Sequence, residues 1–163
     1  MQNLNENNEE SSELLQLVSF MIDREEFGVN ILCVQEINRL MQITKVPNVP
    51  DFVEGVINLR GRVIPVIDLR TKLKIQKKDR DNNTRIIVVE IEEKTIGFIV
   101  DSVKEVLRIP TSITEAPPEM VTGIDSDYIM AVAKLDDRLI TLLNLEKILS
   151  NTEKEELQDV EQS

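Results

Sequence analysis

Apolar residues recur along most of this chain at the spacing of β-strands, and few segments show the spacing of a helix. Residues 15–22 are apolar at nearly every position, and residues 86–91 and 96–100 show the same pattern, with β-branched residues dominating. Short runs that are apolar on both faces are typical of strands covered on both sides. Two segments, 50–54 and 144–149, are the best helix candidates, and Asn144 would be the N-cap of the second, which could run into the C-terminal tail. The pattern predicts a mostly β protein with short helices.

This apolar pattern occurs twice along the chain. Gly28 aligns with Gly97 at an offset of 69 positions (97 − 28), and Arg62 aligns with Arg138 at an offset of 76 (138 − 62). The matching segments are 27–29 with 96–98, 34–37 with 103–106, 59–64 with 135–140, and 67–69 with 143–145. Their order indicates two copies of one unit, roughly 15–73 and 85–149, joined by a linker at 74–84. We expect about five strands in each unit, enough to close a small barrel without exposed edges.

Each unit ends in a predicted hairpin, with Arg60-Gly61 as the turn of the first and Asp136-Asp137 as the turn of the second. The second strand of the first hairpin, at 63–69, is apolar on both faces. Only one face can fill the interior of its own barrel, so the other must be covered by the sibling barrel or by a partner protein. We therefore expect an apolar seam between two barrels.

The negative charge of the chain is concentrated at its two ends. The formal net charge is −11, but residues 1–13 carry four acids and no base, and residues 151–163 carry five acids and one base. This leaves −3 for residues 14–150, so we expect a nearly neutral domain between two disordered acidic tails. The most basic stretch, 70–85, has seven bases and two acids and is typical of a solvated connecting loop. The body therefore lacks the clustered positive face that nucleic-acid binding requires.

The residue types that carry most enzyme chemistry are absent or scattered. The chain has no histidine and only one cysteine, Cys33, which excludes histidine-dependent sites and an internal disulfide. Its five glycines are too dispersed for a phosphate-binding loop. The paired carboxylates at 25–26, 92–93 and 136–137 fall in predicted turns, where solvation explains them better than the converging acids of a hydrolase. We expect no enzymatic activity, no cofactor and no metal, and Cys33 is most simply a small core residue.

The cellular location of the protein is predicted from its N-terminal composition, the length of its apolar runs and its cysteine content. The N-terminal residues are rich in Asn and Glu rather than basic and then apolar, and no apolar run approaches the ~20 residues of a membrane span. A lone cysteine is compatible with a reducing compartment. We expect a cytoplasmic protein.

Two groups of residues suit a protein interface. Residues 34–39 mix apolar and charged side chains where a barrel strand meets a turn, and Arg60 and Arg62 flank a hairpin tip in an otherwise apolar region. A solvated turn arginine is the alternative explanation for the hairpin. A different class, a β-barrel that binds oligonucleotides or a small ligand, would need surface aromatics and a basic groove, whereas aromatics make up only 3% of this chain.

Several motifs resemble the CheW-like domain family of bacterial chemotaxis, over residues 15–149. The segments that carry the resemblance are Leu17–Phe20, Phe27-Gly28-Val29, Val34-Gln35-Glu36-Ile37, Phe52-Val53-Glu54-Gly55-Val56-Ile57-Asn58-Leu59-Arg60-Gly61 and Ile64-Pro65-Val66-Ile67-Asp68-Leu69. This family includes free adaptors, the regulatory domain of the chemotaxis kinase CheA, and CheV. Because the remaining residues leave no room for a kinase or receiver domain, the resemblance favours the free adaptor. It implies two SH3-like five-stranded β-barrels side by side.

The resemblance also implies partners and contact residues. CheW-like adaptors join the cytoplasmic tips of methyl-accepting receptors to the histidine kinase CheA in membrane-associated signalling arrays. By position, the receptor-facing residues would be Val34, Glu36, Ile37, Gly55 and Arg60. The kinase-facing residues would be Val63 and Ile64 in the first unit, and Glu119 and Met120 in the second. The family often has an aromatic residue where this chain has Met120, so the second kinase contact departs from the pattern.

Overall fold

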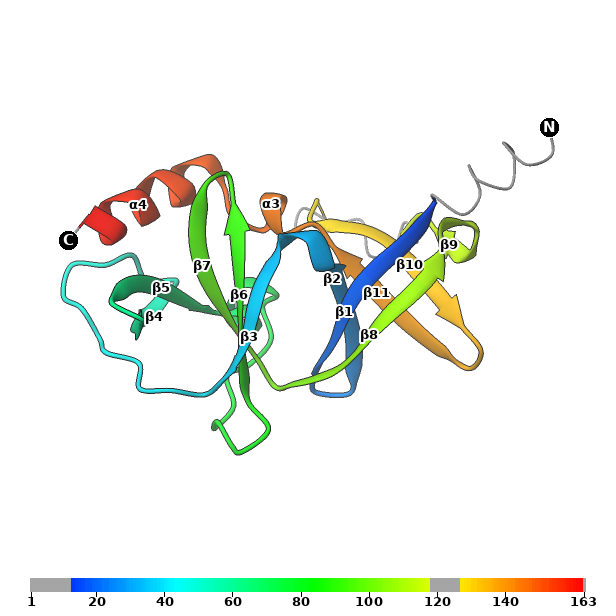
Figure 1. Cartoon of the computed structure of the whole chain (residues 1–163), viewed down its shortest axis with the longest axis horizontal. Helices are drawn as coiled ribbons and strands as arrows, with labels where there is room; N and C mark the ends of the chain where they lie inside the picture. Colours follow the sequence, from blue (N-terminus) through cyan, green and yellow to red (C-terminus); the bar gives the residue numbers. More distant parts are fainter. Residues whose placement is uncertain (1–12, 118–126, 163) are drawn as a thin grey trace.

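The elements of the chain are shown in Figure 1, a computed structural model that describes residues 13–117 and 127–162. The strands are β1 (Leu14–Ile22), β2 (Glu25–Asn30), β3 (Val34–Arg39), β4 (Val53–Leu59), β5 (Arg62–Asp68), β6 (Arg85–Ile91), β7 (Lys94–Val100), β8 (Ser102–Pro110), β9 (Thr114–Glu115), β10 (Ile129–Leu135) and β11 (Arg138–Leu143). The helices are α2 (Leu69–Lys72), α3 (Leu145–Ile148) and α4 (Asn151–Gln162), with 3-10 turns η1 (Ile31–Cys33) and η2 (Thr111–Ile113). The predicted mostly β composition is confirmed. The predicted helix at 50–54 is wrong, because strand β4 begins at Val53.

The strands form two barrel-like sheets that lie side by side (Figure 1). Sheet A has six strands in the order β8-β1-β2-β11-β10-β9, and sheet B has five in the order β3-β6-β7-β5-β4. Strand β9, which adds the sixth strand to sheet A, is only two residues long. The two sheets therefore match the predicted pair of small five-stranded barrels, with one short addition.

The two repeat units exchange strands between these sheets. Strands β1 and β2 of the first unit lie in sheet A with β8–β11 of the second, whereas β6 and β7 of the second unit lie in sheet B with β3–β5 of the first. Where each exchanged hairpin enters its sheet, the strands pair in parallel, β2 with β11 and β7 with β5. The expectation that each unit closes a barrel by itself is therefore wrong, because apolar periodicity defines the faces of a strand but not its hydrogen-bonded neighbours.

The repeat is nevertheless visible in the register of these parallel pairs. Gly28 pairs with Leu142, and Gly97 pairs with Val66, so equivalent residues pair at the two offsets found in the sequence. A Cβ at Gly97 would lie 2.9 Å from the side chain of Ile86, and a Cβ at Gly28 would lie 3.3 Å from that of Leu142. Both glycines therefore allow the exchanged strand to pack closely against its neighbours.

Buried apolar residues form three clusters. One fills sheet B and consists of Ile57, Ile64, Val66, Ile86, Val88 and Ile99. A second fills sheet A and consists of Leu17, Ile109, Ala133, Ile140 and Leu142. The largest contains residues of both sheets, such as Phe20 and Phe27 of sheet A with Ile67 and Phe98 of sheet B. The predicted apolar seam is confirmed. Since burying each such side chain contributes about 1.5–3 kcal/mol, the two sheets stabilise each other.

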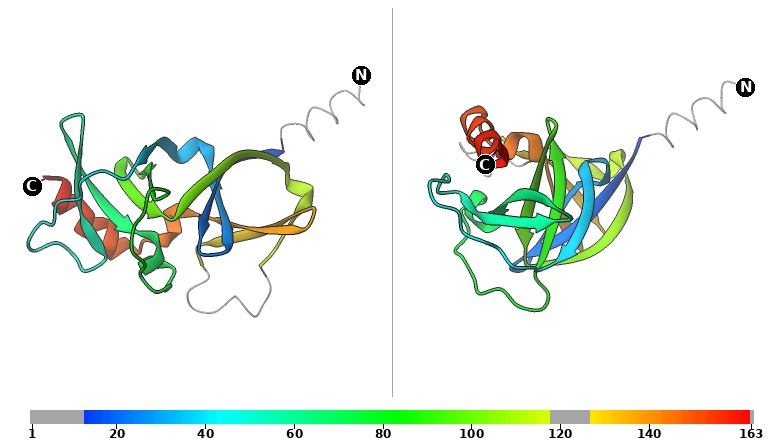
Figure 2. Two further views of the ribbon diagram at one scale, coloured as in Figure 1. Left: turned by 90° about the horizontal axis from the view of Figure 1, so that it is seen from below. Right: turned by 60° about the vertical axis from the view of Figure 1, so that its left-hand side comes forward.

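The C-terminal residues return to sheet B as helices, and Figure 2 shows α4 running alongside that sheet. The predicted N-cap is confirmed, because the Asn144 side chain accepts a hydrogen bond from the backbone N–H of Glu146 at 3.0 Å. A capping box then starts α4: Ser150 Oγ accepts from the Glu153 N–H at 3.1 Å, and Glu153 accepts from the Ser150 N–H at 2.9 Å. Leu157 joins the shared cluster, so the expectation of a disordered tail at 151–163 is wrong for 151–162. The other predicted tail, 1–13, lies outside the described residues except for Glu13.

The predicted linker at 74–84 contains no strand or helix, but ion pairs attach it to the domain. Lys77 and Arg80 both pair with Glu54, Arg80 at 3.2 Å, and Arg80 also lies 3.8 Å from Asp68. The basic charge of this loop is therefore largely matched by acids of sheet B.

Candidate interaction surfaces

The exposed part of the predicted receptor-facing set lies on two elements of sheet B, strand β3 and the β4–β5 hairpin. Strands β3 and β4 stand at opposite ends of the strand order, and Arg60 forms an ion pair with Glu36 between them. Glu36 also accepts a hydrogen bond from the side-chain amide of Asn38 at 2.8 Å. The ion pair therefore joins the two ends of sheet B.

The hairpin turn projects Arg60 outward. Arg60 and Gly61 have φ values of 52° and 86°, the left-handed backbone that a two-residue turn between twisted strands requires. The Asn58 side chain accepts a hydrogen bond from the Gly61 N–H at 2.9 Å and holds the turn in place. The Arg60 side chain is 73% exposed, so it reaches Glu36 across the surface and remains accessible to a partner.

The electrostatics of this surface favour a charged Glu36. The hydrogen bond from Arg60, supported by that from Asn38, holds the pKa of Glu36 below its ordinary value. The surface therefore presents an ionised carboxylate and a guanidinium in contact at neutral pH.

The remaining members of the set differ in exposure. Ile37 is exposed beside Glu36, whereas Val34 is half-buried and packs against the shared apolar cluster. Gly55 is buried, and a Cβ there would lie 2.5 Å from the carbonyl oxygen of Thr44. Thr44 exchanges backbone hydrogen bonds of 2.9 and 2.8 Å with Val56. Gly55 therefore allows the 44–56 contact, and its effect on a partner would be indirect.

The predicted kinase-facing residues Val63 and Ile64 point in opposite directions. Val63 is 46% exposed, but Ile64 is only 2% exposed and belongs to the interior cluster of sheet B. Ile64 cannot present its side chain to a partner without opening the core, so its assignment as a contact residue is wrong. Glu119 and Met120 lie outside the described residues.

Sheet A carries an equivalent surface that the sequence reasoning missed. Val106 and Leu139, which correspond to Ile37 and Val63 at the two repeat offsets, are 57% and 59% exposed. The repeat was the signal that could have identified them, since it aligns both pairs.

The charged residues of this sheet A surface are arranged differently. Arg138 lies 3.4 Å from both Glu26 and Glu105, and Lys104 also lies 3.4 Å from Glu26. Glu26 was expected in a solvated turn, but it is buried on strand β2 and accepts a hydrogen bond from Ser19. Its basic neighbours and Ser19 compensate the cost of burying a carboxylate.

The described residues contain no group of three or more His, Cys, Asp or Glu side chains placed to hold a metal ion. Cys33 is half-buried with its Sγ 2.9 Å from the carbonyl oxygen of Asn30, and burial raises the pKa of its thiol. No helix in the ranges 13–117 and 127–162 is long and apolar enough to cross a membrane.

Two packed barrel-like sheets with exposed apolar and charged side chains are the features of a β-rich protein-interaction domain. The chain belongs to the CheW-like domain family, which it matches over residues 16–153.

Curated relatives agree with this membership. The chain is 38% identical over 134 residues to the chemotaxis protein CheW of Klebsiella aerogenes, covering 82% of this chain and 81% of that protein. It is 36% identical over 141 residues to the chemotaxis protein CheW of Helicobacter pylori, covering 86% and 85%. The crystal structure of the scaffolding protein TtCheW from Thermoanaerobacter tengcongensis superposes with a TM-score of 0.78 at 40% identity, covering 86% of this chain and 96% of that one.

Proposed function

We propose that this protein is a non-enzymatic adaptor that couples methyl-accepting chemotaxis receptors to the histidine kinase CheA. Membership of the CheW-like domain family over residues 16–153 carries this proposal. The naming of a 40% identical relative as a scaffolding protein supports it. An adaptor of this kind would work in the cytoplasm at membrane receptor arrays and would need no cofactor.

The receptor surface of this proposal is centred on the Arg60–Glu36 ion pair and Ile37. Val34 and Gly55, which are less exposed, would contribute by packing beneath these side chains. An exposed arginine on a rigid hairpin beside an apolar side chain has the composition of an interface hot spot. The turn fixes the backbone at Arg60, so little backbone freedom would be lost on binding.

The kinase surface of the proposal includes Val63 on strand β5, and Glu119 and Met120 as a second contact. Val63 is a β-branched side chain exposed on a regular strand, which gives a partner an apolar contact of fixed shape.

A three-component binding assay tests the proposal. The regulatory domain of a chemotaxis kinase is immobilised and mixed with a receptor cytoplasmic fragment, with and without this protein. The receptor fragment should be retained only when the protein is present. Retention of neither the protein nor the receptor fragment would contradict the proposal.

A further inference from the structure

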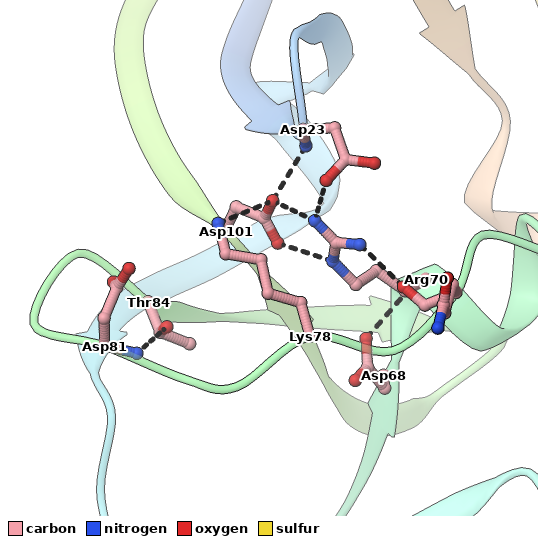
Figure 3. Close-up of polar contacts among 8 residues, drawn as sticks. Asp23, Asp68, Arg70, Lys78, Asp81, Thr84 and Asp101 are labelled. Atoms are coloured by element: carbon pink, nitrogen blue, oxygen red, sulfur yellow. Dashed lines mark hydrogen bonds and ion pairs between the residues drawn. The ribbon is translucent and has the colours of Figure 1, made fainter.

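The chain passes directly from sheet B to sheet A at Asp101, between strands β7 and β8. Figure 3 shows that this residue lies in a cluster with Arg70, which follows strand β5, and Asp23, which lies in the β1–β2 turn. The cluster therefore brings together one element of sheet B, one element of sheet A and the connection between the sheets.

Arg70 is the centre of this cluster, and its side chain is only 5% exposed. Its Nε donates to Asp101 Oδ1 at 2.9 Å, and its terminal nitrogens donate to Asp101 Oδ2, to Asp23 Oδ1 and, at 2.7 Å, to the carbonyl oxygen of Gln76. The planar guanidinium thus bridges two carboxylates and a carbonyl at once, which a lysine cannot reproduce.

The acids around Arg70 are themselves attached to sheet A and to each other. The Asp23 N–H donates to Asp101 Oδ2 at 2.8 Å, and the Asp101 N–H donates to the carbonyl oxygen of Met21 on β1 at 3.1 Å. On the other side, the Asp68 side chain caps α2 by accepting from the Arg70 N–H at 3.0 Å. Arg70 therefore connects the end of β5 to the β1–β2 hairpin through a continuous series of hydrogen bonds.

The second passage between the sheets, from β2 to β3 through η1, is built differently. The repeat offsets place Glu146 at the position of Arg70, Glu92 at that of Asp23, and Leu32 at that of Asp101. Leu32 is 89% exposed, and Glu92 pairs with Lys154 of α4 at 3.2 Å. In the described part of the chain, Arg70 is thus the one buried arginine, and it serves one of the two passages.

We propose that Arg70 is a positioning residue that fixes the orientation of sheet A relative to sheet B. This inference concerns the fold and goes beyond the proposed function, because the described contact residues Glu36, Arg60 and Val63 all lie on sheet B. Without the arginine, Asp23 and Asp101 would repel each other and the hairpin would lose its attachment to α2. The apolar seam would keep the protein folded while the orientation of the sheets became variable.

Distances between spin labels on the two sheets test this proposal without any partner. In a Cys33→Ser background, labels are placed at Arg39 on β3 and Lys134 on β10, both exposed. The parent should give one narrow distance distribution, and Arg70→Met should broaden or shift it. The control is Arg138→Met, which removes an arginine whose partners, Glu26 and Glu105, both lie in sheet A. It should leave the distribution narrow.

Milder variants keep the test decisive if Arg70→Met does not fold. Arg70→Lys retains the charge but loses the fork of donors, and Asp23→Asn removes one carboxylate from a residue whose positive φ asparagine tolerates. Both should broaden the distribution, with unchanged circular dichroism. An unchanged distribution in a folded, less stable Arg70 variant would show that the residue only contributes stability, and would overturn the proposal.

Binding measurements separate this inference from the proposed function. A folded Arg70→Lys variant should bind a receptor fragment as the parent does, because Glu36 and Arg60 both lie on sheet B. Its binding to the kinase regulatory domain through Val63 should be unchanged as well, because Val63 also lies on sheet B. If the parent itself binds neither partner, the proposed function fails while the distance result still decides the role of Arg70. Loss of receptor binding by a folded Arg70→Lys variant would show that Arg70 also shapes the surface of sheet B, and would contradict a role confined to the orientation of the two sheets.

Discussion

Sheets A and B share one plan but use the arginines of their hairpins differently. In sheet B the turn residue Arg60 is exposed and pairs with Glu36, while Arg62 donates to Thr95 Oγ1 at 3.0 Å. In sheet A the turn position of Arg60 is occupied by Asp136, and Arg138, the equivalent of Arg62, lies 3.4 Å from the buried Glu26 and from the exposed Glu105.

The first residues of the two turns share a left-handed backbone, although at the second position Gly61 has a positive φ and Asp137 does not. Arg60 and Asp136 have φ values of 52° and 49°, yet one presents a positive and the other a negative charge. Of these two equivalent turns, only the one in sheet B has a basic side chain at its first position. Two sheets of common design thus present different charges at equivalent surface positions.

Cutting the chain between the repeat units should have the largest effect. A fragment of residues 1–76 contains β1–β5, but lacks the β6–β7 hairpin that lies between β3 and β5 in sheet B. It also lacks every partner of β1 and β2 outside their own hairpin. We expect an unfolded or aggregating fragment by circular dichroism and size-exclusion chromatography. A stable, monomeric fragment with dispersed amide resonances would contradict the observed exchange of strands.

Aspartate substitutions at neighbouring buried and exposed positions of each sheet should have very different effects on stability. Ile64→Asp, and Ile140→Asp at the equivalent position of sheet A, would bury an unpaired charge and cost about 4 kcal/mol or more. Val63→Asp and Leu139→Asp alter exposed side chains and should leave the thermal midpoint nearly unchanged.

The same four variants also test whether the kinase binds the exposed surface of sheet B rather than that of sheet A. Among the folded variants, Val63→Asp should weaken binding to the kinase regulatory domain more than Leu139→Asp does. If folded Val63→Asp binds the kinase as tightly as the parent, the assignment of Val63 is wrong.

Helix α4 gives sheet B a covering, and its removal should destabilise the protein by an intermediate amount. Leu157 is fully buried in the shared cluster, so Leu157→Ala should lower the free energy of unfolding by about 2–5 kcal/mol. The neighbouring Glu156 is exposed, and Glu156→Ala should change it by no more than about 0.5 kcal/mol. Chemical denaturation measures both, and an equal effect of the two substitutions would argue against α4 docking.

Acid should destabilise the β7–β8 passage at Asp101 and not the β2–β3 passage at Leu32. The loss of unfolding free energy should be smaller than that caused by Leu157→Ala. Burial by itself would raise the pKa of Asp101, but hydrogen bonds from Arg70 and Asp23 outweigh it and lower the pKa. The carboxylate therefore contributes stability that is complete above its unfolded pKa of about 3.9 and is lost as pH falls through the lower folded pKa. Leu32, at the equivalent position, has no titratable group.

Unfolding free energies measured from pH 7 down to pH 2 test this pH dependence. Asp101→Asn should be less stable than the parent at pH 7, and the difference should shrink as the pH falls below about 4. A difference that stayed constant over this range would show that the charge of Asp101 does not stabilise the junction.

The amino-acid pattern predicted the strands, the repeat and the apolar seam, because these depend on local alternation and on matched spacing. It did not predict the exchange of strands, since a strand such as β6 has the same apolar faces whichever sheet it joins. For the same reason Ile64 could not be separated from Val63: residues 63–67 are apolar on both faces, and only the folded sheet defines its interior.

The burial and the partners of charged residues also could not be predicted from the sequence. Arg70 and Glu26 belong to charged segments that are typical of loops and turns, and their burial depends on partners distant in the sequence. A helix running from 144–149 into the tail was one expectation, but the acidic composition of 151–163 favoured disorder there. The Ser150–Glu153 capping box was a readable signal for the separate start of α4. The Glu36–Arg60 pair was predicted as two surface residues, but their direct contact required the structure.

Reversing the charge of Glu36 tests most directly whether receptor and kinase use separate surfaces, and it should affect stability least. In one preparation of Glu36→Lys, affinities for a receptor fragment and for the kinase regulatory domain are measured beside those of Glu105→Lys, its equivalent in sheet A. We predict that Glu36→Lys remains folded, loses roughly 30-fold or more in receptor affinity and keeps its kinase affinity, while Glu105→Lys keeps its receptor affinity. Equal loss of both partners from folded Glu36→Lys, or an equal receptor defect in Glu105→Lys, would contradict an adaptor with separate surfaces.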